Sequence, residues 1–431
     1  MTPLTHGRVL KIALPIVASN VTVPLLGLVD TAVVGQLGEA APIGAVGLGA
    51  VILSAFFWMF GFLRMGTTGL AAQAHGAGDV AETSAILKRG LLIAFAAGFA
   101  MVVLQVPLAA AAFKLAPGSE GVESLAAQYL QIRIWGAPAT IGMYALTGWL
   151  IALERTRAVM ALQMITNFAN IGLDLWFVLH LGWGVPGVAL ATLIAEWSGL
   201  LFGLWLVRDG LRVAGARIFD AGKLRRMAMV NSHIMIRSIL LQACFTSFLF
   251  LSSGRGDLEI ASNQILLQFL EVMAYLLDGF AFAAETLVGQ AVGARSRDRL
   301  GRAVRLTSTW GVTGALLMSA LFALAGPSII DLMTTAADVR AEARHYLPWV
   351  IAAPLIGIAA WMFDGIYIGA TFTREMMVTA ALSAATYALC VWASWGYGNH
   401  GLWLSLMVFN AARGLSQAAL YSRIPRSLHD A

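Results

Sequence analysis

The stretch that decides the fold is "YLQIRIWGAPATIGMYALTGWLIALERTRAVM", residues 129–160, because it recurs later in the chain. Laid over "YLPWVIAAPLIGIAAWMFDGIYIGATFTREMM", residues 346–377, it gives nine identities in 32 positions and needs no gap. The same register, in which Tyr129 lies over Tyr346, places "AQAHGAG" at 72–78 over "GQAVGAR" at 289–295. One register shared by distant segments predicts that the chain consists of two related halves.

The composition is that of an integral membrane protein. Of the 431 residues, 59% are hydrophobic and 12% are charged, and the mean hydropathy is +0.78. Soluble globular domains contain far more charge. An apolar helix of about 20 residues crosses a hydrocarbon core of about 30 Å. We expect twelve such spans, at residues 9–34, 43–74, 85–112, 124–152, 158–180, 185–208, 225–252, 258–290, 302–326, 343–370, 376–396 and 400–421.

The repeat divides these spans into two sets of six. We expect an N-terminal lobe at 1–206, a cytoplasmic connector at 207–226 and a C-terminal lobe at 227–431. Because six is an even number, both lobes cross the membrane in the same direction, as parallel repeats related by a pseudo-two-fold axis along the membrane normal. The sequence therefore predicts an all-α membrane protein of two six-helix bundles. This architecture is typical of transporters that open alternately to the two sides.

The basic residues predict the orientation. With the N-terminus inside, twenty Lys and Arg fall on the inner side, and only Lys114, Arg255, Arg340 and Arg344 fall outside. The positive-inside rule then places both termini in the cytoplasm. The net charge of +5 is explained in this way without a nucleic-acid partner. The first span is too long for a cleavable signal peptide, so we expect it to remain as a membrane helix.

Polar residues within the spans of the first half point to one site. Asn170 and Asp174 are four residues apart on one helix face. By their distance from the outer ends of their spans, Asp30, Asp174 and Thr192 reach a similar depth. Oxygen ligands of this kind suit Na⁺ or a proton rather than a transition metal. Two alternatives stay open: Asn170 and Asp174 join helices by hydrogen bonds, or Thr192 bonds its own helix backbone.

Other polar residues in the spans are Glu196, Arg133 and Arg413. Glu196 has no evident partner in the sequence, and Arg133 is expected to extend outward to the membrane surface. Pro15 removes a helical hydrogen bond in the first span and is expected to let that helix bend. Arg413 is expected to pair or to reach the cytoplasmic surface.

The second half carries a different polar set. Arg237 lies near the middle of its span, and Glu271 and Asp278 lie seven residues apart on the next one. We expect Arg237 to pair with Glu271 or Asp278, in either a structural or a functional role. Asp364 overlies Thr147 in the repeat, so the two halves differ in charge at corresponding backbone positions.

Motifs for ATP hydrolysis and for hydrolytic enzymes do not occur in the sequence. It has no G-x-x-x-x-G-K-[ST], H-E-x-x-H or G-x-S-x-G pattern. We therefore expect no enzyme activity and no cofactor. If transport is active, its energy comes from an ion gradient.

Several segments resemble a known family. They are "ALPIVASNVTVPLLGLVDTAVVGQLG" from Ala13, "GLAAQAHGAGD" from Gly69, "LERTRAVM" from Leu153 and "NIGLDLWFV" from Asn170. Together with the two six-helix repeats, they resemble the multidrug and toxic compound extrusion (MATE) family. "NSHIMIRSILL" from Asn231 and "LDGFAFAAETLVGQAVGA" from Leu277 are similar to its DNA-damage-inducible F (DinF) branch. The resemblance covers essentially the whole chain and implies export of varied compounds in exchange for H⁺ or Na⁺.

The resemblance also implies site residues. The cation site in the first half of DinF-like members falls on Asp30, Asn170, Asp174, Thr192 and the backbone carbonyl of Val188. The proline associated with bending of the first helix falls on Pro15, and the family's acid in the tenth span falls on Asp364. One departure concerns the seventh span, where the glutamate of the NorM branch is missing and the nearby polar residue is Arg237.

We therefore expect a secondary active efflux antiporter of the bacterial inner membrane that exports cationic or amphipathic, drug-like compounds. We expect a monomer in the lipid bilayer, with H⁺ or Na⁺ as the coupling ion. A lipid-linked saccharide or other lipid flippase of the same superfamily is the alternative, but it would favour a strongly basic cavity. A membrane-embedded transferase would need a cluster of catalytic side chains, for which the outer loops are too short.

Overall fold

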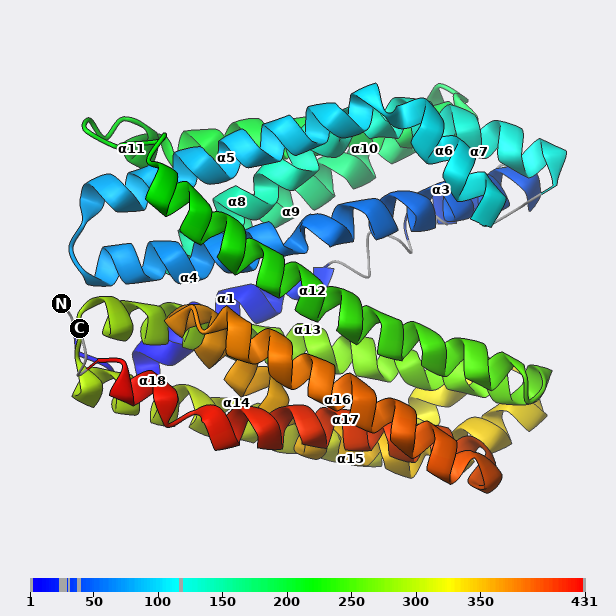
Figure 1. The fold of residues 1–431 in the computed structure, drawn as a ribbon. Helices are drawn as coiled ribbons and strands as arrows, with labels where there is room; N and C mark the ends of the chain where they lie inside the picture. Colours follow the sequence, from blue (N-terminus) through cyan, green and yellow to red (C-terminus); the bar gives the residue numbers. More distant parts are fainter. Residues whose placement is uncertain (1–2, 23–28, 30–31, 37–39, 116–118, 429–431) are drawn as a thin grey trace. The chain divides into compact units, whose positions relative to one another are not determined.

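The computed structural model is built from helices (Figure 1). It describes residues 3–22, 29, 32–36, 40–115 and 119–428. The first half contains α1 (His6–Asn20), α3 (Ala40–Trp58), η1 (Met59–Gly61), α4 (Phe62–Gly76), α5 (Val80–Val103), α6 (Gln105–Leu115), α7 (Glu120–Arg133), η2 (Ile134–Gly136), α8 (Ala137–Ala152), α9 (Thr156–Asp174), η3 (Leu175–His180), α10 (Gly184–Leu206) and α11 (Arg208–Leu211). The second half contains α12 (Ala221–Ser253), α13 (Asp257–Gly293), α14 (Arg297–Met333), α15 (Ala337–Ala370), α16 (Thr373–Ser394), η4 (Trp395–Tyr397), α17 (Gly398–Leu420) and α18 (Arg423–Arg426).

Within the described ranges, nine helical segments are long and apolar enough to cross a membrane. Ten of the twelve predicted spans overlap them, because the segment Thr373–Arg426 contains both α16 and α17. The predicted span at 124–152 is divided between α7 and α8 by the short 3₁₀ helix η2. The predicted span at 9–34 lies partly outside the described residues. The prediction of an all-α membrane protein is confirmed.

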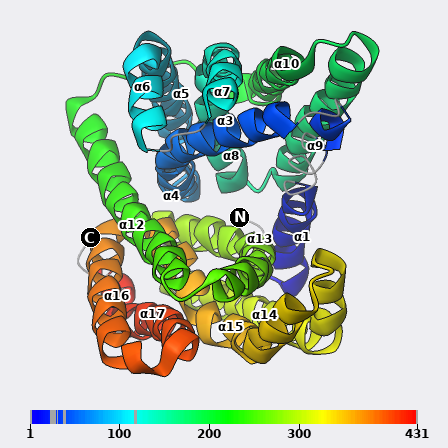
Figure 2. The same ribbon diagram turned by 90° about the vertical axis from the view of Figure 1, so that its right-hand side faces the viewer.

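The chain forms two compact units. Unit 1 comprises Met1–Val17, Ala72–Gly78 and Arg226–Ala431, and unit 2 comprises Ala18–Ala71 and Asp79–Arg225. In unit 1, α13 packs on α14 and α15, and α17 packs on α15 and α16 (Figure 2). In unit 2, α10 packs on α7, α8 and α9, while α5 packs on α8 and α3 on α7. The lobe boundaries at 206 and 227 stay a prediction.

The backbone carries the repeat that the sequence predicts. Among the residues that the structure describes, three non-glycine residues have a positive φ: Glu154 (59°), Arg295 (51°) and Thr371 (56°). Glu154 lies over Thr371 in the repeat, and Gly78, whose φ is 75°, lies over Arg295. A left-handed conformation is unusual for residues other than glycine. Its recurrence in the register of the sequence repeat confirms the internal repeat at the level of chain geometry.

The side-chain caps at the N-termini of two helices also recur at equivalent positions of the repeat. Asp79 begins α5 by accepting a hydrogen bond from the Glu82 amide (2.8 Å), and Ser296 begins α14 by accepting one from the Arg299 amide (3.4 Å). Asp79 and Ser296 are again equivalent positions of the repeat. Aspartate and serine both satisfy free amides at helix N-termini, so different residues make the same cap.

Repeat-related residues also contact one another in unit 1. A Cβ atom added at Gly76 would overlap the backbone of Gln290, and one added at Gly293 would overlap the backbone of Gln73. Since Gln73 pairs with Gln290 and Gly76 with Gly293 in the repeat, the contact is reciprocal, as at a two-fold interface. The end of α4 and the end of α13 thus approach closely because glycine occupies both crossing points.

Arginine side chains hold the two glutamines of this crossing. Arg8 donates from Nη2 to Oε1 of Gln290 (3.0 Å), and Arg226 donates from Nη2 to Oε1 of Gln73 (3.0 Å). Gln73 also donates from Nε2 to the carbonyl of Gly369 (2.9 Å). We call the contact of Gln73, Gly76, Gln290 and Gly293 the reciprocal crossing.

We expect Gly76→Ala and Gly293→Ala each to lower stability by about 1–3 kcal/mol, because the added methyl group meets backbone that has to move. Thermal unfolding of the purified protein in detergent measures the loss. Gly301→Ala is the matched control, since a Cβ at this position of α14 meets no atom within 4 Å. Equal melting temperatures for all three variants would show that the crossing is not tightly packed.

Candidate functional site

The structure brings Asn170 and Thr192 together inside unit 2. Asn170 lies on α9 and Thr192 on α10, and both side chains are buried. Asn170 donates from Nδ2 to Oγ1 of Thr192 (2.9 Å), and Thr192 in turn donates to the carbonyl of Val188 (3.0 Å). Thr192 therefore forms hydrogen bonds with its own helix and with α9 at once. The bond to its own backbone, which the sequence left as an alternative, does not prevent the contact with Asn170.

Asp174 lies one turn beyond Asn170 and is completely buried. It is the last residue of α9, where the helix continues into the π-helical segment η3. Such wider turns are rare in proteins and occur often at functional sites. The predicted Asp30 lies outside the described residues. Asn170, Asp174, Thr192 and Val188 therefore constitute the described part of the predicted cation site.

The oxygen atoms of this group suit a hard cation. The Oδ1 atom of Asn170 is buried and accepts no hydrogen bond from the described part of the protein. Carboxylate, amide, hydroxyl and carbonyl oxygens are the ligands that such ions prefer. Among the described residues, no group of three or more His, Cys, Asp or Glu side chains has the arrangement of a metal site. The side chains of Asn170, Asp174 and Thr192 and the carbonyl of Val188 thus supply the oxygen donors of this group.

Glycines bring the helices of the site close together. Gly199 of α10 faces Thr166 of α9, and an added Cβ would overlap Thr166 Oγ1. Gly187, near the start of α10, faces the backbone and side chain of Phe177 in η3. Because both ends of the helix pair are in close contact, Thr192 lies within hydrogen-bond distance of Asn170.

One contact beside the site did not emerge from the sequence. Asn167 donates from Nδ2 to Oγ1 of Thr22 (2.8 Å), which joins α9 to the segment that follows α1. Asn167 precedes Asn170 by three residues and Asp174 by seven, so all three share one helix face. This spacing could have pointed to Asn167 as a member of the site. Thr22, which accepts its hydrogen bond, has no distinguishing feature in the sequence.

The expectation that Arg133 extends outward is wrong. Arg133, at the end of α7, forms two hydrogen bonds with Glu196 of α10, at 2.6 and 2.9 Å. The Arg133 side chain is buried and the Glu196 side chain is nearly so, with exposed fractions of 8% and 13%. Gly136 leaves the space for this pair, because a Cβ there would overlap the Glu196 carboxylate. Inside an apolar bundle a paired guanidinium costs less free energy than an unpaired one.

The expected partners of Arg237 are also wrong. Arg237 of α12 pairs with Asp364 of α15, whereas Glu271 is exposed and Asp278 is partly exposed. Arg413 of α17 pairs with the same carboxylate at 2.5 Å. A third partner is Gln417, which donates from Nε2 to Asp364 Oδ1 (2.7 Å). We call Arg237, Asp364, Arg413 and Gln417 the α12–α15–α17 cluster. Asp364, rather than Glu271 or Asp278, thus brings two arginines to one carboxylate.

Pro15 lies inside α1 as expected. Its half of the helix packs on α13 in unit 1, where a Cβ at Gly279 would meet Val17 and Ala13. Whether the helix bends there stays a prediction.

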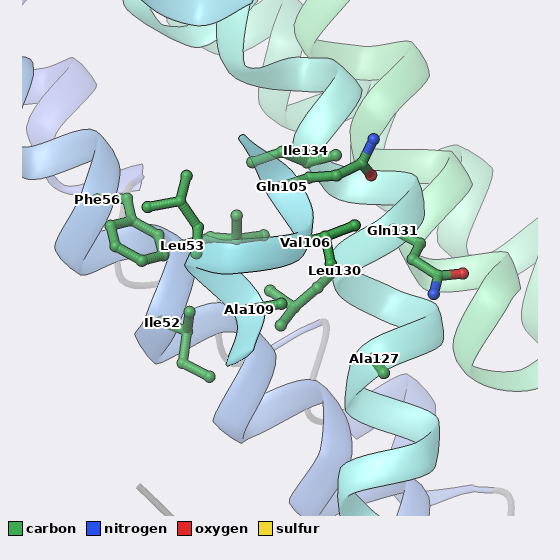
Figure 3. A pocket seen from close by; sticks show the side chains of 11 residues that line it. Ile52, Leu53, Phe56, Gln105, Val106, Ala109, Ala127, Leu130, Gln131 and Ile134 are labelled. Atoms are coloured by element: carbon green, nitrogen blue, oxygen red, sulfur yellow. The ribbon is translucent and has the colours of Figure 1, made fainter. Parts of the chain in front are cut away.

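A separate pocket in unit 2 is mainly apolar (Figure 3). It has a volume of about 240 Å³ and lies between α3, α6 and α7. Gln105 and Gln131 are its polar side chains, and its other lining residues are apolar. None of its lining residues belongs to the group around Asn170, so the pocket and the polar site are distinct features.

The helical architecture and the buried oxygen group define an all-α, multi-pass membrane protein, and solved structures with the same fold are transporters. A Vibrio cholerae MATE transporter, VcmN, in its bent form matches with a TM-score of 0.88 over 98% of this chain and 97% of that one, at 19% identity. A MOP superfamily transporter from Pyrococcus furiosus matches with a TM-score of 0.85 over 98% and 96% of the two chains, at 18% identity.

The sequence comparison gives the family. The MatE family model matches residues 15–176 and 234–391, one match in each repeat. DNA damage-inducible protein F of Escherichia coli is 42% identical over 96% of this chain and 91% of its own length. A probable multidrug resistance protein NorM of Pseudomonas aeruginosa is 27% identical over 96% and 87% of the two chains. The chain belongs to the MatE family of membrane transporters.

We expect Glu196→Gln to destabilise the protein by about 3–5 kcal/mol, because it leaves the Arg133 guanidinium buried without a counter-charge. Thermal unfolding in detergent provides the measurement. The double variant Arg133→Met/Glu196→Leu should recover most of the loss, since it removes both charges.

Asp209→Asn is the control for this comparison. It breaks an ion pair with Arg155 in which the two side chains are 60% and 38% exposed, so its effect should stay below about 1 kcal/mol. If Glu196→Gln lowered stability by no more than Asp209→Asn does, the Arg133–Glu196 pair would contribute little to the stability of the fold.

Proposed function

We propose that this protein is a secondary active multidrug efflux antiporter that exports cationic or amphipathic compounds in exchange for H⁺ or Na⁺. The observation that carries the proposal is the buried oxygen group of Asn170, Asp174 and Thr192. Burial of the Asp174 carboxylate disfavours its charged form and so favours uptake of a proton or sharing of a cation. Multidrug resistance in the name of the Pseudomonas aeruginosa relative supports the substrate class.

Coupling is assigned to the first half of the chain. The acid of the second half, Asp364, already accepts hydrogen bonds from two guanidinium groups and one amide. A carboxylate neutralised in this way has little affinity for a further cation. Asp174 is buried on the same helix face as Asn170, whose amide meets the Thr192 hydroxyl, and this supports the N-terminal lobe as the coupling site.

Transport follows from a difference in ion affinity between two conformations. An ion or proton at Asp174 stabilises one conformation of the helices that hold the site, and the exported compound stabilises the other. The reciprocal crossing joins helices from the two sequence halves at their predicted cytoplasmic ends. Alternating access requires this contact to open whenever the substrate path opens to the cytoplasm.

The protein acts in a bacterial inner membrane, with both termini in the cytoplasm. The distribution of Lys and Arg supports this orientation, and the bacterial relatives support the compartment. The pump works as a monomer, because each chain contains both halves of the repeat.

We expect Asp174→Asn to reduce drug efflux at least tenfold, because the amide neither takes up a proton nor neutralises a cation. Efflux of ethidium from a pump-deficient bacterial host gives the first readout. Counter-flow into proteoliposomes, with a pH gradient and a Na⁺ gradient imposed separately, identifies the ion. Asp209→Asn is the matched control, since it makes the same change at an exposed position. Full efflux by Asp174→Asn would reject the assigned site.

A further inference from the structure

The buried charges of the α12–α15–α17 cluster do not balance. Arg237 and Arg413 both form ion pairs with Asp364. Within the described part of the chain, neither guanidinium forms an ion pair with a second carboxylate. The exposed fractions of Arg237, Asp364 and Arg413 are 8%, 7% and 3%. The cluster therefore holds one net positive charge in the interior of the helices.

A surplus cation at such a position is expensive. Removing an ion from water costs several kcal/mol, and a partner of opposite charge must offset that cost. The one carboxylate of the cluster is shared by two arginines, so it offsets a single positive charge. An anion is the ligand that offsets the other.

Two buried polar atoms of the cluster have no hydrogen-bond partner among the described residues. They are Nε of Arg237 and Oε1 of Gln417. Arg237 meets Asp364 through Nη2, so its Nε–H remains as a donor. A guanidinium offers five N–H groups in a planar fork, and a carboxylate ligand accepts them in pairs. Arg237 is thus a surplus cation with donor capacity left.

Asp364 fixes the geometry of the cluster. Its Oδ2 accepts from Arg237 and Arg413, and its Oδ1 accepts from Gln417. Arg413 is also placed beside the ring of Trp361, with its guanidinium carbon 5.6 Å from the ring centre. Because both carboxylate oxygens of Asp364 accept hydrogen bonds, Asp364 holds the two arginines in place and does not bind a cationic ligand.

We propose that the α12–α15–α17 cluster is an anion subsite, at which Arg237 binds the carboxylate or other single anionic group of an amphipathic compound. This inference rests on the proposed function in one respect, because it takes the bound compound to be one that the protein exports. It adds a charge preference to the substrate class: compounds with one anionic group bind in the second half of the chain, whereas simple cations do not.

A pair of probes with the same apolar part and opposite charge tests the subsite. The probes are 4-phenylbutyrate and 4-phenylbutylamine, which are an anion and a cation at neutral pH. Isothermal titration of the full-length protein in a neutral detergent should give an affinity for the anion at least tenfold higher than for the amine. Equal affinities, or no binding of the anion, would overturn the proposal and leave water as the partner of the free Nε–H.

Three substitutions locate the binding. Arg237→Gln leaves one arginine and one carboxylate, a balanced pair, and should weaken 4-phenylbutyrate binding at least tenfold. Asp364→Asn leaves both guanidinium groups without a counter-charge and should keep or strengthen it. Arg344→Gln is the control, because it removes the same charge from a partly exposed ion pair with Asp331 elsewhere in unit 1. It should change the affinity less than twofold.

Further measurements distinguish a loss of anion binding from a loss of folding and from a loss of transport. Each variant is first compared with the wild type by gel filtration, and Arg413→Gln replaces Arg237→Gln if the latter does not remain monodisperse. Unchanged anion binding in the arginine variant that is used would reject the subsite. Titration needs no ion gradient, so arginine-dependent anion binding without gradient-driven efflux would reject the proposed antiport and leave the subsite standing.

Discussion

The cost of a charged group inside an apolar helix bundle is the constraint on which the polar architecture of this protein depends. Arg133 and Glu196 satisfy it as a bidentate pair. Asp364 satisfies it by accepting from two arginines. Water is not available as a partner within the hydrocarbon core, so each such group is bound to another helix. The same groups therefore hold the helices together and define the electrostatics of the two halves.

The two halves share a backbone and differ in chemistry. Left-handed residues and helix caps recur at equivalent positions of the repeat, and the reciprocal crossing places repeat-related glycines and glutamines against each other. The buried charged residues within the spans do not follow the repeat. Asn170, Asp174 and Thr192 give the first half a group of neutral and acidic oxygens, whereas Arg237 and Arg413 give the second half a surplus of positive charge.

This asymmetry fits a division of labour between the halves. An oxygen group suits a cation or a proton, and a guanidinium with free donors suits an anion. In the antiport that we propose, a small cation binds at one place and the exported organic compound at another. Conserving the backbone while varying a few buried side chains lets one helical framework serve both purposes.

The sequence by itself determined the helices, the repeat and the residues of the oxygen group. Apolar length determines a membrane span, because the bilayer has a fixed thickness, and spacing of four residues places Asn170 and Asp174 on one face. Only the tertiary structure decided which charges meet. Arg133 with Glu196, and Arg237 with Asp364, are pairs from helices far apart in the chain, and several carboxylates were equally plausible partners. Which pair forms depends on the rotation and depth of each helix, and those are set by packing against its neighbours rather than by its own residues.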